Sequence, residues 1–251
     1  MGKIALNKNS RVVFLGDSIT DVKFNSRMAR KIKGRRVYAL QLKKRFKEYS
    51  KNVRVDIRGI ASNRTYHVYD RFTADCVSLK PDVIIMLFGV NDAWENYVPE
   101  QYPPLLRPME PHFKEIFRRI KAELPDTQVL YLMPFMIDAV EEKQPFHKTL
   151  DDFRQRLRAI AEENGAVILD LQQVFYEKQK KTEPKLLAID GIHPTNLGHK
   201  VIADAVEKMI DYRMYNQLTR QHMSGDFLIS IYNLFALCYN QINIHSIKGW
   251  Y

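Results

Sequence analysis

Residues 11–21 read Arg-Val-Val-Phe-Leu-Gly-Asp-Ser-Ile-Thr-Asp, an apolar run that stops at a glycine and delivers a serine. The continuous run from Val12 to Leu15 predicts a short strand buried on both faces, as in the interior of a parallel sheet. The Gly-Asp-Ser that follows then lies at the carboxyl end of the strand, where open α/β sheets bind their ligands. Ser18 is therefore a candidate nucleophile, and it would need a base, an orienting acid and an oxyanion hole.

Further apolar runs follow, and amphipathic segments separate them. Strands are predicted over residues 12–15, 53–57, 83–88, 129–133 and 166–171. Helices are predicted where apolar residues recur at helical spacing, over residues 38–49, 68–79, 113–124, 150–161, 172–181 and 202–210. This alternation predicts a three-layer α/β fold, in which helices cover both faces of one parallel sheet.

The polarity of the strands predicts their order. Residues 53–57 alternate apolar with polar side chains, whereas residues 83–88 are apolar throughout, so we place the former strand at an edge of the sheet. The expected arrangement is then a five-stranded parallel sheet in the flavodoxin-like order 2-1-3-4-5. Residues 92–107 and 134–148 are predicted to be long loops at the carboxyl end of this sheet.

The size and charge of the chain limit its function class. Its 251 residues, of which 45% are hydrophobic, can bury the core of one α/β domain. The formal net charge is +10, and residues 23–36 contain a basic cluster that nucleic acid could bind. A solvated basic loop is the simpler reading, because no recognised nucleic-acid-binding pattern accompanies the charge. We therefore expect no nucleic-acid partner.

The cysteines and the first residues of the chain indicate the cellular compartment in which we expect the protein. Cys76 and Cys238 are the only cysteines, too few and too far apart for a disulfide framework or a metal cluster, so we expect reduced thiols. The first ten residues contain no long apolar run, and neither a secretory signal nor a membrane anchor is predicted. We expect a cytoplasmic protein without a membrane partner.

The composition shifts abruptly near the carboxyl terminus. Residues 224–251 contain only Asp226 and Lys248 as fully charged side chains and are rich in Ile, Asn, Tyr and Phe. We therefore predict one domain over residues 1–212 and an extension over residues 213–251. The extension could pack on the domain, on a partner subunit of a homo-oligomer, or on nothing, and it could also be non-native.

Asp190 and His193 lie three residues apart in a loop that should return to the carboxyl end of the sheet. One turn can then supply both a base for Ser18 and the acid that orients the base. Asn91 follows an apolar strand and could donate to an oxyanion, although Asn-Asp after a strand is by itself an ordinary turn. Backbone N–H groups of Ser18 and of the loop 59–63 would complete the oxyanion hole.

Four blocks together resemble those of the SGNH/GDSL hydrolase family and occur in the family's order, namely Gly16–Asp21, Gly59–Asn63, Gly89–Asp92 and Asp190–Pro194. The resemblance covers roughly residues 8–212. It implies a serine esterase in which Ser18 is the nucleophile, His193 the base and Asp190 the orienting acid. The Ser18 N–H and the Asn91 side chain would donate to the oxyanion. The resemblance implies neither a metal nor a cofactor.

The second block departs from the family pattern. The family usually has Gly-x-Ser-Gly-Asn there, with an oxyanion N–H on the second glycine, whereas this chain has Ser62 at that position. Serine keeps the N–H, but a positive φ would cost it more than glycine. In the first block, Thr20 replaces the last glycine of a Gly-x-Ser-x-Gly elbow, which argues against the α/β-hydrolase fold.

The sequence is most similar to the bacterial acetyl-xylan esterase branch of the family, which implies a small acyl ester as substrate, and an acetylated oligosaccharide in particular. Asp17 and Trp94 are predicted substrate contacts, although Trp94 could equally anchor its loop. Two alternatives stay open. One is a lysophospholipase or thioesterase, and the other is a catalytically silent carbohydrate-binding scaffold on the same fold.

Overall fold

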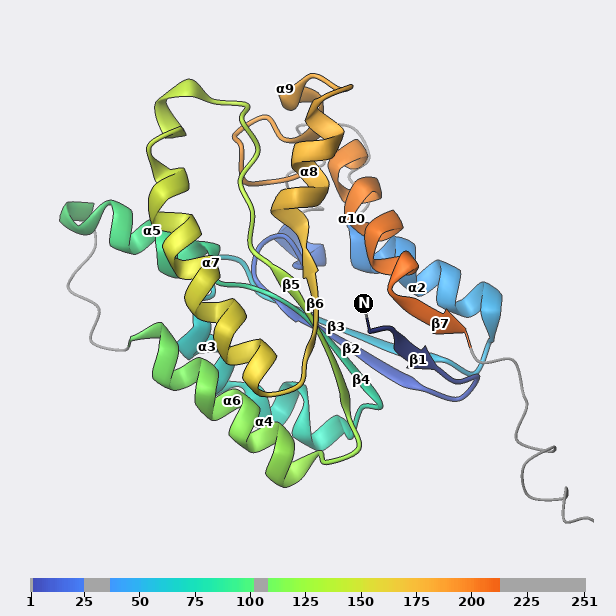
Figure 1. Ribbon diagram of the computed structural model, residues 1–251. Helices are drawn as coiled ribbons and strands as arrows, with labels where there is room; N and C mark the ends of the chain where they lie inside the picture. Colours follow the sequence, from blue (N-terminus) through green and yellow to red (C-terminus); the bar gives the residue numbers. More distant parts are fainter. Residues whose placement is uncertain (1, 25–36, 102–107, 213–251) are drawn as a thin grey trace, which may run out of the picture. The chain divides into compact units, whose positions relative to one another are not determined.

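The computed structural model describes residues 2–24, 37–101 and 108–212 of the chain. Within these residues, a parallel sheet of five strands lies between two layers of helices (Figure 1). The order β3-β2-β4-β5-β6 confirms the predicted order 2-1-3-4-5, with β3 at an edge. The strands are β2 (Arg11–Gly16), β3 (Arg54–Gly59), β4 (Val83–Leu87), β5 (Gln128–Met133) and β6 (Val167–Asp170).

Helices connect the strands and cover both faces of the sheet. Those that share one apolar cluster with the sheet are α2 (Tyr38–Tyr49), α8 (Leu171–Gln179), α9 (Pro184–Leu187) and α10 (Asn196–Lys208). Those that share the cluster on the other face are α3 (Thr65–Asp70), α4 (Phe72–Asp75), α5 (Val90–Tyr97), α6 (Met109–Glu123) and α7 (Phe146–Glu163).

Strand β2 shows why a short apolar run forms the middle of the sheet. Val12 and Phe14 belong to the apolar cluster on one face, and Val13 and Leu15 belong to the cluster on the other. Successive side chains of a strand point to opposite faces, so a strand that is covered on both sides must be apolar at every position. Burial of each such side chain stabilises the fold by about 1.5–3 kcal/mol.

The register of the strands brings the predicted site segments to one place. Gly16 at the end of β2 pairs with Gly59 at the end of β3 and with Leu87 at the end of β4. From these three strand ends the chain passes into the turn that carries Ser18, the loop that carries Ser62, and helix α5. The parallel sheet therefore collects these segments at its carboxyl end.

The prediction of one helix over residues 68–79 is wrong. The helix breaks after Asp70, α4 spans Phe72–Asp75, and a 3₁₀ turn, η1, spans Val77–Leu79. Buried side chains keep helical spacing across these breaks, so the spacing does not reveal them. Pro81 then ends the segment, because proline cannot continue a helix.

The prediction of a loop over residues 92–107 is also wrong in part. Residues Val90–Tyr97 form α5, and Pro99–Gln101 form a 3₁₀ turn, η2. Val90 and Ala93 are buried in the cluster that includes α7. Trp94 and Tyr97 pack against the same cluster, so the segment does have helical spacing, but the prolines that follow favour a loop.

A second, two-stranded sheet was not predicted from the sequence. β1 (Ile4–Leu6) pairs in parallel with β7 (Ile210–Tyr212), and Ile4 lies opposite Ile210. Three residues are too few to show the alternation of a strand. All three residues of β1 are nonetheless buried, so this pair extends the core beyond the main sheet.

Several predictions concern residues that the structure does not describe. Residues 25–36 of the basic cluster, Cys238, and the extension 213–251 lie outside the described residues, so the domain boundary at residue 212 stays a prediction. Cys76 is a buried thiol. Within the described ranges, no helix is long and apolar enough to cross a membrane. In the same ranges, no group of three or more His, Cys, Asp or Glu is arranged to hold a metal ion.

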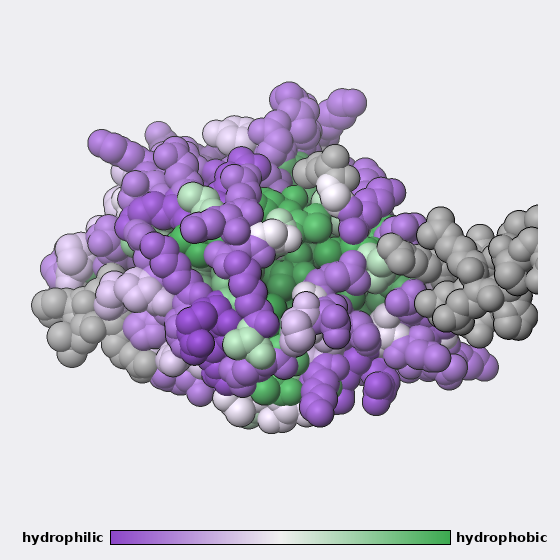
Figure 2. All heavy atoms as spheres, turned by 60° about the horizontal axis from the view of Figure 1, so that its bottom comes forward, coloured by the Kyte–Doolittle hydropathy of each residue, from purple (hydrophilic) through white to green (hydrophobic). Residues whose placement is uncertain are grey.

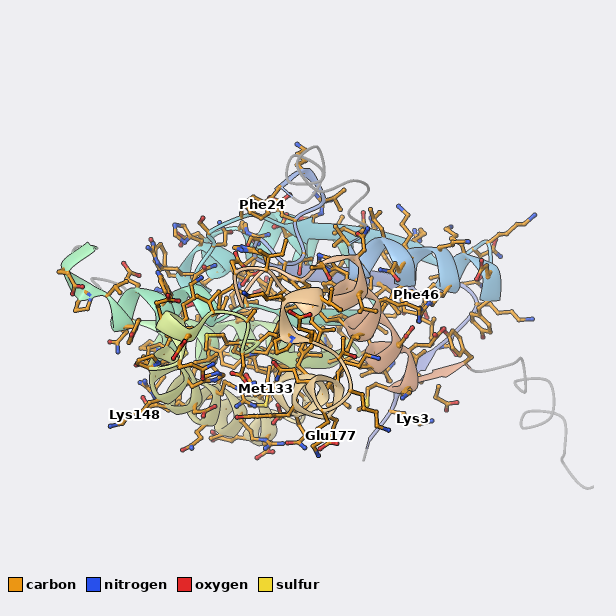
Figure 3. All side chains as sticks on the ribbon, turned by 90° about the horizontal axis from the view of Figure 1, so that it is seen from above. Lys3, Phe24, Phe46, Met133, Lys148 and Glu177 are labelled. Atoms are coloured by element: carbon orange, nitrogen blue, oxygen red, sulfur yellow. The ribbon has the colours of Figure 1, made fainter. Side chains whose placement is uncertain are left out.

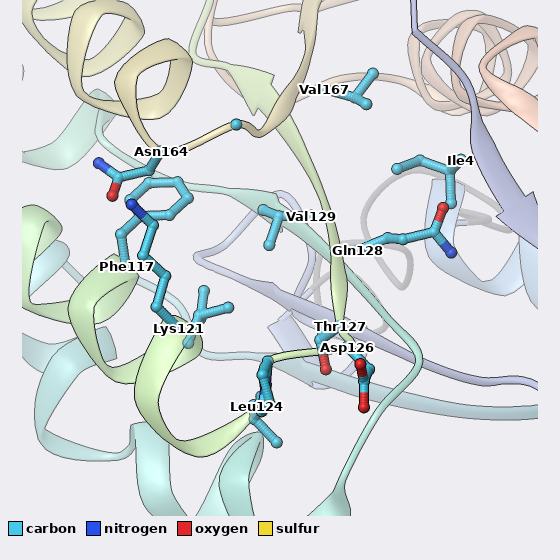
Figure 4. Close-up of a pocket in the computed structure, with 13 residues that line it drawn as sticks. Ile4, Phe117, Lys121, Leu124, Asp126, Thr127, Gln128, Val129, Asn164 and Val167 are labelled. Carbon is cyan, nitrogen blue, oxygen red and sulfur yellow. The ribbon is translucent and has the colours of Figure 1, made fainter.

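A hollow of about 350 Å³ lies at the amino end of β5 and β6. Apolar side chains form much of its wall, among them Phe117, Leu124, Val129 and Val167 (Figure 4). Figure 2 turns this end of the sheet forward and shows apolar residues at the centre of the face with hydrophilic residues around them. None of the predicted site residues lines the hollow.

Candidate active site

The turn that follows β2 is organised by Asp17. The Asp17 carbonyl accepts hydrogen bonds from the backbone N–H groups of Thr20 (3.1 Å) and Asp21 (2.9 Å). Gly16 leaves room for the turn, because a Cβ there would lie 2.7 Å from a carbonyl oxygen of the neighbouring strand β4. The tight turn places Ser18 directly after the strand end, with 5% of the residue exposed.

Ser18, His193 and Asp190 are joined by hydrogen bonds. Ser18 Oγ lies 3.0 Å from Nε2 of His193, and Nδ1 of His193 lies 2.6 Å from Oδ2 of Asp190. When the ring proton is on Nδ1 and forms a hydrogen bond to the carboxylate, Nε2 presents its lone pair to the Ser18 hydroxyl. The arrangement can therefore take the proton from Ser18 as the hydroxyl oxygen attacks a substrate.

The second oxygen of Asp190 is held by its own loop. Oδ1 accepts from the backbone N–H groups of Ile192 (3.0 Å) and His193 (2.7 Å). Partial burial raises the pKa of Asp190, but the hydrogen bonds and charge of His193 lower it by more, so the pKa lies well below that of an ordinary aspartate. The carboxylate is therefore ionised at neutral pH, as an orienting acid must be.

Two side chains next to these residues were not anticipated from the sequence. The rings of Phe24 and His193 lie 5.2 Å apart, centroid to centroid, and Figure 3 labels Phe24 toward the rim of the molecule. Lys143 donates from Nζ to the carbonyl of Asp190 (2.7 Å) and lies 5.4 Å from the centre of the Trp94 ring. Each contact joins segments far apart in the chain, so no local pattern could indicate it.

Asn91 lies in the first turn of α5, directly beyond β4. Its Nδ2 donates to the carbonyl of Asn63 (3.0 Å), and the amide carries a second hydrogen for another acceptor. The neighbouring Asp92 accepts the Thr65 N–H through both carboxylate oxygens (3.1 Å each), and burial raises the pKa of Asp92 to about 7. These bonds hold the start of α5, and with it Asn91, against the loop that follows β3.

Ser62 adopts the left-handed conformation, with a φ of 62°, and its side chain is exposed. Among the described residues, Lys80 is the only other non-glycine with a positive φ. The neighbouring Ala61 donates its N–H to Oδ2 of Asp21 (3.0 Å), which ties this loop to the turn of the candidate nucleophile. The left-handed backbone suits glycine and costs a residue with a Cβ about 1–2 kcal/mol.

Ser62→Gly should raise the free energy of unfolding by about 0.5–1 kcal/mol, because relief of the left-handed strain exceeds the extra entropy of glycine in the unfolded chain. Ester hydrolysis should hold or increase, since the backbone N–H is kept. Denaturant unfolding and kcat measure the two effects. Ser62→Ala is the matched control, because it keeps the N–H and the Cβ. A loss of about 10²–10³-fold in kcat in both variants would assign the oxyanion contact to the hydroxyl instead.

Asp17 does not lie where a substrate contact must. The residue is fully buried, its Oδ1 accepts from the N–H of Ile19 (3.0 Å), and none of the described residues donates to its Oδ2. Burial raises the pKa of this carboxyl to about 6. Because no part of Asp17 reaches the surface, we correct the predicted substrate contact to a structural role in the turn.

Trp94 lies on α5 within an aromatic cluster. Its ring meets the ring of Phe146 nearly at right angles, with centroids 5.0 Å apart, and lies 5.7 Å from the ring of Tyr97. A tryptophan that is packed on two aromatic neighbours fixes the helix that carries it. These contacts favour the anchoring alternative over the predicted contact with a sugar.

The chain is similar in sequence and in fold to known GDSL-like hydrolases. The profile of the GDSL-like Lipase/Acylhydrolase family matches residues 14–201. An acetylxylan esterase from Geobacillus stearothermophilus is 27% identical over 165 residues, which are 64% of this chain and 73% of the relative. A GDSL-like protein from Parabacteroides merdae has a TM-score of 0.72 and 27% identity, over 82% of this chain and 98% of its own. Axe2, an acetylxylan esterase from G. stearothermophilus, has a TM-score of 0.67 and 25% identity, over 81% of this chain and 94% of its own.

Proposed function

Because the chain belongs to the GDSL-like lipase/acylhydrolase family and is a carboxylic ester hydrolase, we propose that it cleaves short-chain esters through an acyl-enzyme on Ser18. The observation that carries this proposal is the pair of hydrogen bonds, 3.0 and 2.6 Å long, that joins Ser18 to His193 and His193 to Asp190. A serine nucleophile, a histidine base and an orienting carboxylate joined in this order form an arrangement that supports nucleophilic catalysis.

Acylation begins when Ser18 Oγ attacks the carbonyl carbon of the ester and His193 Nε2 takes the hydroxyl proton. The negative oxygen of the tetrahedral intermediate accepts hydrogen bonds from the Asn91 side chain and from the N–H groups of Ser18 and Ser62. The intermediate collapses by breaking the bond to the leaving alcohol, which takes the proton from Nε2. The acyl group is left bound to Ser18.

Deacylation repeats the same steps with water as the nucleophile. His193 takes a proton from water, the hydroxide oxygen attacks the acyl carbon, and the second intermediate uses the same oxyanion hole. Its collapse returns the proton to Ser18 and releases the carboxylic acid. Asp190 stays ionised throughout and stabilises the imidazolium that forms in both halves of the reaction.

Within this class, we propose acetyl esters of carbohydrates, and acetylated xylo-oligosaccharides in particular, as the substrates. The support is the similarity to the acetylxylan esterase of G. stearothermophilus, at 27% identity. The alternative is a lysophospholipase or thioesterase. The two proposed substrate classes differ in the length of the acyl group. A long acyl chain needs an apolar channel beside the nucleophile.

The kcat/KM for p-nitrophenyl acetate should exceed that for p-nitrophenyl octanoate by on the order of ten- to a hundredfold, because a long chain without a channel stays in water or clashes. A series of acetyl, butyryl and octanoyl esters measures this preference, with Ser18→Ala as the background. Release of acetate from acetylated xylo-oligosaccharides tests the proposed sugar directly. Equal or faster hydrolysis of the octanoyl ester would favour the lipase alternative.

A further inference from the structure

Arg71 lies between α3 and α4, outside the four sequence blocks, and 15% of its side chain is exposed. Its guanidinium group donates to groups on several segments. Nε bonds to Oδ1 of Asn63 (2.8 Å), Nη2 to the carbonyl of Gly16 (2.8 Å), and Nη1 to the carbonyl of Arg58 (3.0 Å) and to the carboxylate of Asp75. One side chain thereby joins the ends of β2 and β3 to the loop that follows β3.

Two of these partners lie next to groups of the active site. Gly16 is separated from Ser18 by a single residue. Asn63, whose side chain is held by Arg71, accepts through its own carbonyl from Nδ2 of Asn91 (3.0 Å). Arg71 is therefore linked to the strand end that carries the nucleophile and, through one intervening residue, to the side-chain donor of the oxyanion hole.

We propose that Arg71 is a positioning residue that fixes the separation of Ser18 from the Asn91 amide and so aligns the oxyanion hole. This inference rests on the proposed esterase function. A guanidinium suits the role because its N–H groups point in fixed directions within one plane and can reach oxygens on different segments. A lysine ammonium carries the same charge but offers no such fork.

The competing explanation is an ordinary helix ion pair. Asp75 lies four residues after Arg71, and such i,i+4 pairs stabilise helices without any relation to a site. The ion pair uses Nη1, whereas Nε and Nη2 face Asn63 and Gly16. The two explanations differ in which measured quantity changes, because an ion pair affects stability and an aligned oxyanion hole affects kcat.

Arg71→Met should lower kcat for p-nitrophenyl acetate by about 10²–10³-fold, the loss typical of one oxyanion donor. KM should stay within about threefold, since the oxyanion hole acts in the transition state more than in the ground state. Arg71→Lys should recover part of the loss. Arg45→Met is the matched control, because Arg45 is also largely buried and bonds to Asp204 and Glu207 (2.6 Å each) between α2 and α10. It should keep kcat within about threefold.

Hydrogen exchange of the backbone N–H groups of residues 60–63 provides a measurement that does not depend on activity. Exchange there should be faster in Arg71→Met and Arg71→Lys than in Arg45→Met. Unchanged exchange overturns the positioning role even if the protein hydrolyses no ester, whereas an inactive wild type with faster exchange in the variants counts against the proposed function alone. An equal loss of kcat in Arg45→Met also overturns the proposal.

Asn63→Ala tests the same link if Arg71→Met does not fold. It removes the Oδ1 acceptor but keeps the carbonyl that Asn91 contacts. The expected loss in kcat is about tenfold, smaller than for Arg71→Met, because the bond of Arg71 to Gly16 remains. A folded Asn63→Ala variant with unchanged kcat and unchanged exchange of residues 60–63 overturns the proposed route from Arg71 to Asn91.

Discussion

Ser18→Ala should reduce the hydrolysis of p-nitrophenyl acetate by at least about 10⁴-fold, because covalent catalysis loses the atom that bonds to the acyl group. Ser18 is 5% exposed, and the fold should be unaffected because the Asp17 carbonyl, not the Ser18 side chain, accepts the backbone hydrogen bonds of the turn. Initial rates with the purified variant measure the effect, and thermal unfolding followed by circular dichroism checks the fold. Full activity in a folded variant would contradict the assignment of the nucleophile.

Ser10→Ala is a matched control for this substitution. Ser10 is also buried, at 2% exposure, and its hydroxyl accepts from the N–H of Asn7 (3.0 Å) before the start of β2. Its loss should alter stability and leave hydrolysis unchanged. A fluorophosphonate probe should label the wild type and Ser10→Ala but not Ser18→Ala. An unlabelled, folded wild type would favour the silent scaffold.

Asp190→Asn should lower kcat by on the order of 10⁴-fold, because it favours the tautomer of His193 that cannot act as a base. The Asn oxygen must take the place of Oδ1, which accepts from the N–H groups of Ile192 and His193 (3.0 and 2.7 Å). The amide nitrogen then faces Nδ1 of His193 and donates to it. This arrangement leaves the ring proton on Nε2, which faces Ser18 and can no longer accept its proton.

Asp138→Asn is the matched control for Asp190→Asn. Oδ1 of Asp138 lies 2.7 Å from Nε2 of His147, so the variant disturbs a second carboxylate–histidine pair. Its kcat should stay within about threefold of the wild type. The pH dependence of kcat separates the two variants further, because the rate of Asp190→Asn should be low at every pH at which the fold is intact. A kcat for Asp190→Asn close to that of Asp138→Asn would remove Asp190 from the proposed mechanism.

The main sheet could be predicted because each of its strands has a recognisable pattern of apolar residues in its own sequence. The apolar run of β4 is the pattern of a strand covered on both faces, and the alternation in β3 is the pattern of an edge. The pair β1 and β7 lacks such a pattern, because three residues are too few for a period to be visible, and the helical spacing within α5 was outweighed by the prolines that follow it. These elements are stabilised by contacts with distant parts of the chain, which the local sequence does not contain.

Some residues of the candidate site could likewise be predicted from the sequence, and others could not. Ser18 and Asn91 could be selected because they follow the ends of strands in a parallel sheet, and Asp190 and His193 because an acid and a base lie three residues apart in one loop. Phe24, Lys143 and Arg71 could not, since a phenylalanine, a lysine or an arginine in a connecting segment gives no sign of which partner it will meet. For Trp94 the sequence left two alternatives, and only its contacts with Phe146 and Tyr97 favour one of them.

The parallel pair of β1 and β7 can form only late in synthesis on the ribosome. Ile4 leaves the ribosome before the strands of the main sheet, whereas its partner Ile210 leaves after all of them. The main sheet can assemble earlier, because its neighbouring strands are much closer in the chain. The apolar side chains of Ile4–Leu6, all buried in the finished fold, can therefore reach their full burial only after Ile210–Tyr212 have been made, although Ala5 can bond to Gln128 on β5 earlier.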